Sequence, residues 1–74
     1  MEKDVSNIIF DPDKLAAALV ESNVSQAELA RAIGAGHRNV VNRIIKGART
    51  ITATELLQIS IILKKDPLYF ARNN

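Results

Sequence analysis

Residues 25–47 read SQAELARAIGAGHRNVVNRIIKG, and this stretch decides the fold. Ser25 and Glu28 have the spacing of a capping box, in which each side chain bonds the backbone amide of the other. We therefore predict that a helix begins at Gln26. It ends at Gly34, because glycine adopts the left-handed conformation of a C-cap without strain. The expected core residues of this helix are Leu29, Ala30 and Ile33.

A second helix is predicted from about His37 to Lys46, after the turn at residues 34–36. At about 100° per residue, its apolar side consists of His37, Val41, Ile44 and Ile45. The opposite, acid-free side carries Asn39, Asn42, Arg43 and Lys46, with Arg38 near its edge. Asparagine bonds adenine edges, arginine grips guanine edges and lysine neutralises phosphate. This side predicts contact with DNA; the alternative is an ordinary solvent-facing helix.

The flanking segments carry signals of further helices. Asp11-Pro12 predicts a helix start, because aspartate caps the first turn and proline needs no amide donor there, and this helix runs to about Ser22. Residues 52–55 repeat the capping box and begin a helix that runs to about Lys64. Asp66-Pro67 begins a last short helix. The core residues expected from these helices are Leu15, Ala18, Leu19, Val20, Leu56, Ile59, Leu63, Leu68, Tyr69 and Phe70.

Two further segments have more than one interpretation, and the C-terminal residues are not expected to be helical. Ile8–Phe10 is a short apolar clip that packs on the domain or extends as a strand. Leu57 and Ile61 form a second apolar stripe on the helix from residue 52, interpreted as core, with a dimer contact as the alternative. Residues 71–74 are expected to fray.

Composition and charge exclude several classes of function. The 74 residues are 47% apolar and 24% charged, which is typical of one globular domain. There is no cysteine and one histidine, so we expect no disulfide, no zinc site and no cofactor. The acids lie mainly at helix starts, where capping explains them, so we expect no enzyme. No signal peptide or membrane span is recognisable, and we expect a soluble cytoplasmic protein.

The net charge of +2 is small, but its distribution is uneven. Between Leu29 and Thr54 there are five cations and no acid. Such a region suits an anionic partner, for example a phosphate backbone. The alternative is a solvated basic face without a partner.

The chain resembles the lambda-repressor/Cro-type helix-turn-helix DNA-binding proteins, the XRE family, over roughly residues 11–70. The resemblance rests on SQAELA and Ile33-Gly34, on Asn42-Arg43-Ile44 before Gly47, and on the helix at 52–63. It implies an all-α, compact fold of four to five helices. In this family the second helix lies across the DNA backbone and the third enters the major groove.

Carried over by position, the resemblance implies base contacts from Arg38, Asn39 and Arg43. It implies backbone contacts from Ser25, Gln26, His37, Asn42, Lys46 and Arg49. Two departures bear on these positions. The stretch from Gly34 to Gly47 is one residue longer than the usual pattern, and we place the extra residue in the turn at 34–36. If the extra residue lies elsewhere, the DNA-contacting positions carried over from the family shift by one. Ile45 replaces a frequent acid, and either packs on the following helix or faces a partner.

The resemblance also implies function and organisation. We expect residues 1–10 to be a flexible N-terminal tail and residues 11–72 to be the helix-turn-helix DNA-binding domain. The protein would bind double-stranded DNA as a homodimer on a palindromic operator and regulate transcription, with repression the family's commonest role. The alternative is the same fold used as a protein-protein interaction module, an antitoxin or adaptor, that binds its partner through the helix at 52–64 or through Ile45.

Overall fold

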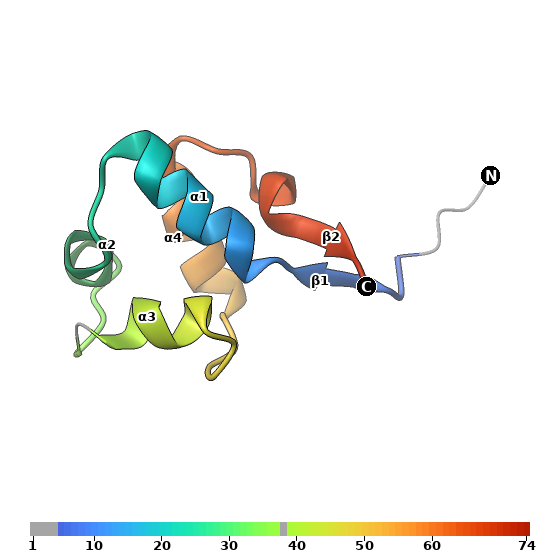
Figure 1. The fold of residues 1–74 in the computed structure, drawn as a ribbon, viewed down its shortest axis with the longest axis horizontal. Helices are drawn as coiled ribbons and strands as arrows, with labels where there is room; N and C mark the ends of the chain where they lie inside the picture. The colour runs from blue at the N-terminus through green and yellow to red at the C-terminus, as the bar shows by residue number, and fades with distance from the viewer. Residues whose placement is uncertain (1–4, 38) are drawn as a thin grey trace.

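A computed structural model describes residues 5–37 and 39–74. Within them the chain forms β1 (Ile8–Phe10), α1 (Pro12–Ser22), α2 (Gln26–Ala32), α3 (Asn39–Ile45), α4 (Ala53–Leu63), the 3-10 helix η1 (Pro67–Phe70) and β2 (Ala71–Asn73). Figure 1 shows α1 between α3 and η1, with α2 at one end of the molecule and the two strands at the other. The predicted all-α, compact fold of four to five helices is confirmed as a mostly α-helical fold, to which the structure adds a small two-stranded sheet. Among the described residues, no helix combines the length and apolar character needed to cross a membrane.

Local capping explains where the helices begin. The Asp11 carboxylate accepts a hydrogen bond from the backbone N–H of Asp13 at 3.0 Å, and Pro12 occupies the first turn. Ser25 and Glu28 form both bonds of the predicted capping box, each at 3.0 Å. A second capping box begins α4 in the same way. These contacts join residues two or three positions apart, and for this reason the starts of α1, α2 and α4 were predictable from the sequence.

The core draws on every α-helix and on η1. Leu15, Leu29, Val41, Ile59 and Phe70 are each at most 1% exposed. Most predicted core residues are confirmed as buried or half-buried. The predictions for Val20 and Leu68 are wrong, since these side chains are 82% and 78% exposed. Both lie beside buried residues on short amphipathic helices, where one position turns a side chain by about 100–120° and so moves it out of a narrow buried side.

The second apolar stripe of α4 is not core. Ile59 and Leu63 face inward and are buried, whereas Leu57 and Ile61 are 55% and 78% exposed. The α2 helix and η1 pack against the inner side of α4. The four-residue spacing of Leu57 and Ile61 places them together on its outer side. The interpretation of this stripe as core is therefore wrong, and an exposed apolar surface remains.

The two ends of the chain pair as a small antiparallel sheet. Ile8 lies opposite Asn73, and Phe10 lies opposite Ala71. The backbone N–H of Asn74 also donates to the carbonyl of Asn7 at 2.8 Å. The expectation that residues 71–74 fray is therefore wrong. Of the expected tail at residues 1–10, residues 8–10 form β1, the strand that one interpretation of the apolar clip allowed. Three-residue segments carry no readable periodicity, and their partner lies at the far end of the sequence.

The sheet is fastened to the start of α1. The Lys14 ammonium group donates to the carbonyl of Ala71 at 2.9 Å, and the Arg72 guanidinium lies 3.6 Å from the Asp11 carboxylate. The rings of Phe10 and Phe70 stack with their centroids 5.9 Å apart. These contacts hold the two strands against α1 and η1, so that the strands continue the helical core.

Candidate nucleic-acid interface

The α3 helix has one buried and one exposed side. Val41 and Ile44 are 0% and 1% exposed, because α1 and α2 pack against this side. Asn39, Arg43 and Lys46 are exposed, and Asn42 is half-buried at the edge. The spacing of four and three residues aligns the exposed three on one side of α3 and its C-terminal end. Two cations and an amide thus share a surface that has no acid between them.

The N-terminus of α3 differs from the sequence prediction. The helix begins at Asn39 rather than at about His37, and the His37 side chain is exposed rather than on the apolar side. The physical reason is a local cap. Nδ1 of His37 accepts a hydrogen bond from the backbone N–H of Asn39 at 3.2 Å, and the backbone carbonyl of His37 accepts one from the N–H of Val40 at 3.1 Å. The predicted base contact Arg38 lies outside the described residues.

The turn that follows α2 contains a glycine in the left-handed conformation. The α2 helix ends at Ala32, and Gly34 adopts a left-handed conformation with φ of +73°. The backbone N–H of Ala35 returns to the carbonyl of Ala30 at 2.9 Å, which completes the C-cap. The glycine stop was predicted from the sequence. The hydrogen bond from the backbone N–H of Asn39 to the His37 side chain was not, because histidine has no strong capping preference.

The N-terminus of α2 holds two more of the expected contact residues. Ser25 is exposed, and Gln26 is half-buried at the first helical position. The hydrogen bond from the Ser25 backbone, followed by the one from its hydroxyl group, lowers the pKa of the Glu28 carboxyl below its ordinary value. The first amides of a helix have no partner within the helix, so this end of α2 offers donors to an anion.

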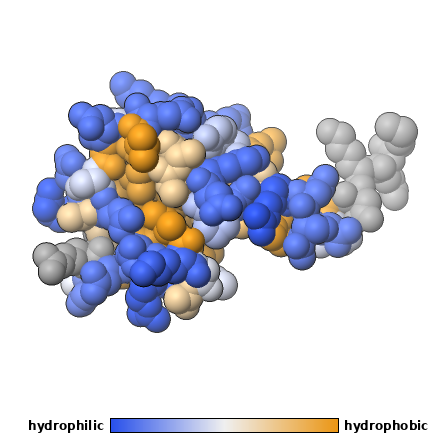
Figure 2. Space-filling view, in the orientation of Figure 1, coloured by the Kyte–Doolittle hydropathy of each residue, from blue (hydrophilic) through white to orange (hydrophobic). Residues whose placement is uncertain are grey.

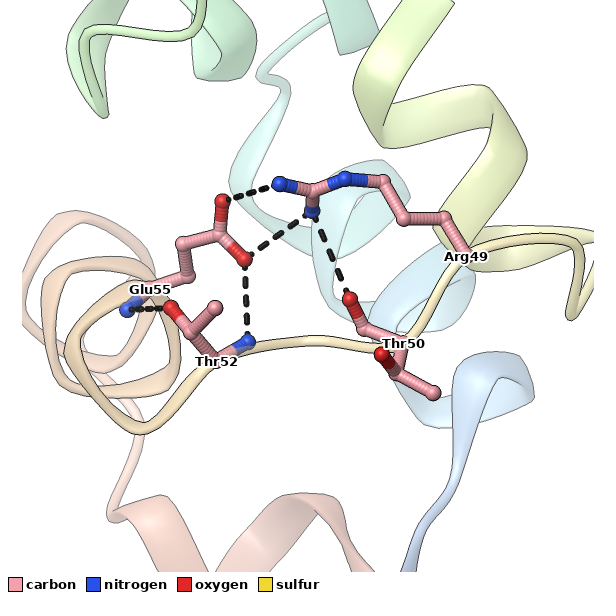
Figure 3. A network of polar contacts seen from close by, with 4 residues as sticks. All are labelled: Arg49, Thr50, Thr52 and Glu55. Carbon is pink, nitrogen blue, oxygen red and sulfur yellow. Dashed lines mark hydrogen bonds and ion pairs between the residues drawn. The ribbon is translucent and has the colours of Figure 1, made fainter.

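The loop from α3 to α4 contains a network that sequence reasoning missed. Gly47 adopts a φ of +76°, and the Arg49 side chain reaches across the loop to Glu55 at the start of α4 (Figure 3). The Nη1 and Nη2 atoms of Arg49 donate to Oε1 and Oε2 of Glu55 at 3.0 and 2.9 Å. Arg49, predicted as a backbone contact, is thus engaged by a carboxylate.

This ion pair shifts the pKa values of both partners in the directions that favour their charged forms. The hydrogen bonds from Arg49 are the main cause that lowers the pKa of the Glu55 carboxyl, and those to Glu55 are the main cause that raises the pKa of the Arg49 guanidinium. In the sequence, Glu55 already had a role in the capping box at residues 52–55. Nothing therefore indicated that it also binds Arg49. The available signal was that Glu55 is the first acid after the cationic stretch.

Ile45, which was expected to pack on the following helix or to face a partner, packs against the core at the edge of an open groove. It is half-buried and lines a groove with Leu19, Val20 and Val24, on the side of α1 and the N-terminus of α2. Figure 2 shows apolar atoms gathered between α1 and α3 on this face, with hydrophilic residues around them. The groove lies beside the predicted DNA-contacting residue Gln26, which is also part of its lining.

Comparison with known proteins identifies the arrangement. A family model described as Helix-turn-helix matches residues 15–70, which is more than half of the chain. No curated protein and no solved structure was found to match the chain.

Proposed function

The chain belongs to the helix-turn-helix family of the lambda-repressor/Cro (XRE) type, a family of DNA-binding regulators, and from this premise we propose that it reads double-stranded DNA with α3 in the major groove. The single observation that carries the proposal is that one side of α3 is buried and the opposite side is exposed. Val41 and Ile44 are buried, Asn39 and Arg43 are exposed, and residues 39–46 contain no acid. Asparagine and arginine are the side chains that bond adenine and guanine edges.

The proposed contacts divide into two sets. Asn39 and Arg43 contact base edges, together with Arg38, whose role is proposed from its family position alone. The proposed phosphate contacts lie at the N-terminus of α2 and around α3: Ser25, Gln26, His37, Asn42 and Lys46. Arg49 belonged to this second set in the sequence prediction, and its pairing with Glu55 is treated below.

We also propose that two copies bind together. A seven-residue recognition helix spans few base pairs, and paired helices double the site that is read. The exposed Leu57 and Ile61 on α4 supply an uncharged surface that meets a second copy without like-charge repulsion. Such a dimer would bind an inverted repeat, and at a promoter it would repress transcription by occlusion.

The same exposed stripe favours a second candidate function, a protein-protein interaction module. In that case Leu57 and Ile61 would bind a different protein, and the cations of α3 would be solvated only. Salt dependence separates the two functions, because phosphate contacts release counterions and apolar docking does not.

Selection from a pool of random-sequence duplexes tests the proposal. The protein retains duplexes over several rounds, the retained fraction is sequenced, and the selection is repeated with Arg43→Ala. Enrichment of an inverted repeat that is lost in the variant is the expected result. A parent protein that enriches no sequence and shows only weak, salt-sensitive binding would contradict sequence reading and favour the protein-partner function.

A further inference from the structure

Arg49 is the last cation of the acid-free stretch, and Glu55 is the first acid after it. The two side chains meet end to end, with two hydrogen bonds at 3.0 and 2.9 Å. The Arg49 side chain is 32% exposed and that of Glu55 is 16% exposed. Nη1 of Arg49 also donates to the carbonyl of Thr50 at 3.5 Å. The guanidinium is thus held against the protein by acceptors from the loop and from α4.

The carboxylate that holds Arg49 is itself fixed in place. Its Oε1 atom accepts a hydrogen bond from the backbone N–H of Thr52 at 3.0 Å, and the backbone N–H of Glu55 donates to the Thr52 hydroxyl at 3.1 Å (Figure 3). The capping box of α4 therefore orients this acid before any pairing occurs. An acceptor that is already ordered loses little entropy when it binds a cation.

The exposed cations of α3 are in a different situation. Among the described residues, no ion pair engages Arg43 or Lys46. These side chains offer their whole charge to a phosphate backbone. Arg49 offers a pair whose net charge is zero. A phosphate that approaches Arg49 meets donors already bonded to Glu55 and the negative charge of that carboxylate beside them, so its attraction to Arg49 is weakened.

We propose that Glu55 withdraws Arg49 from the phosphate backbone and is in this way a specificity-determining residue. The inference rests on the proposed DNA binding. Sequence-independent affinity grows with the number of phosphates that cations neutralise, whereas base contacts add only on the correct site. An acid that cancels one cation beside the recognition helix lowers binding to all duplexes and leaves base reading intact. The ratio of specific to non-specific binding therefore rises.

Two variants test this inference. Glu55→Gln retains an oxygen for the capping box, since glutamine also serves at that position, but it releases Arg49. Arg49→Gln/Glu55→Gln removes both charges, so its local charge equals that of the ion pair. Binding is measured by fluorescence anisotropy on a mixed-sequence duplex of about 20 base pairs, roughly two helical turns, over a series of salt concentrations. Circular dichroism at the same temperature checks that each variant is folded.

Glu55→Gln is expected to bind the duplex roughly threefold to tenfold more tightly, with a slope of log affinity against log salt steeper by about 0.9, as for one more neutralised phosphate. The double variant is expected to match the parent in affinity and slope. Glu21→Gln is the matched control, because it releases Lys65 from an ion pair at 2.9 Å outside the proposed contacts and changes the net charge equally. It is expected to retain the parent's slope.

Three results would overturn the inference. The first is a Glu55→Gln variant that gains no affinity. The second is a double variant with a shallower slope than the parent, which would mean that Arg49 already neutralises a phosphate; this comparison does not need the single variant to fold. The third is an equal gain in Glu21→Gln, which would assign the effect to net charge. A parent without salt-dependent duplex binding would instead refute the proposed function, and the inference with it.

Discussion

Arg43 is the residue on which sequence reading depends most directly. It is exposed on the acid-free side of α3, and arginine bonds guanine through two parallel hydrogen bonds. Arg43→Ala is expected to cost about 1–3 kcal/mol of binding free energy on the enriched site and to relax the base preference there. Anisotropy titrations on the enriched duplex and on single-base variants measure both effects.

Lys46→Ala is the matched control for Arg43→Ala. Lys46 is exposed at the C-terminal end of the same helix and is proposed to contact phosphate only. Its removal should weaken binding to every duplex by a similar factor. Equal losses on all duplexes in Arg43→Ala would contradict its role in base reading.

Glu55 also makes stability depend on pH. Hydrogen bonds from Arg49 are the main cause that holds the pKa of the Glu55 carboxyl in the folded protein below the ordinary 4.5. The unfolded state therefore takes up the proton at a higher pH than the folded state does. The stabilisation from Glu55 is complete above the unfolded value and is lost as the pH falls through the lower, folded value.

The parent should accordingly be more stable than Glu55→Gln at neutral pH, and this difference should shrink in acid below the ordinary glutamate pKa of 4.5. Denaturant titrations of both proteins across this range provide the measurement. Both retain Glu28, whose lowered pKa cancels in the comparison. A difference that stays constant with pH would show that the ion pair does not stabilise the fold.

Among the elements, η1 shows how one four-residue segment joins the strands to the core. Phe70 is 1% exposed and packs against the rings of Phe10 and Tyr69, whereas Leu68 is 78% exposed. Phe70→Ala is expected to cost about 3–5 kcal/mol of unfolding free energy, a large part of a small domain's stability. Leu68→Ala, the control, should change it by less than about 0.5 kcal/mol. Thermal and denaturant unfolding compare the two, and similar losses would contradict the burial pattern.

Helix starts were the most predictable elements, and α3 was the exception. The α1, α2 and α4 helices have caps from Asp, Ser or Thr, which the sequence displays directly. The start of α3 depends on His37, a residue type without a strong capping preference. The residues of the candidate interface could be selected from sequence, but the pairing of Arg49 with Glu55 could not, because it depends on the path of the loop between them.

At the scale of the whole molecule, the exposed stripe on α4 determines the proposed assembly. Ile61→Lys introduces a charge at a residue that is 78% exposed, so the fold should tolerate it. The expected result is loss of the dimer and weaker binding to an inverted repeat, measured by sedimentation and by anisotropy. Val20→Lys is the control for the oligomeric state, since Val20 is 82% exposed on α1 rather than on α4. An Ile61→Lys protein with an unchanged oligomeric state would refute this dimer surface.

The sequence by itself determined the helix-turn-helix motif, the starts of α1, α2 and α4, and most of the core. Capping boxes and helical periodicity connect residues that are close in sequence, and their physics is local. Tertiary structure alone decided that Ile8–Phe10 pairs with Ala71–Asn73, that Leu57 and Ile61 remain exposed, and that Glu55 engages Arg49. Each of these depends on how the chain brings separated segments together, because a strand partner, a covered face or an ion pair exists only when the rest of the fold is in place.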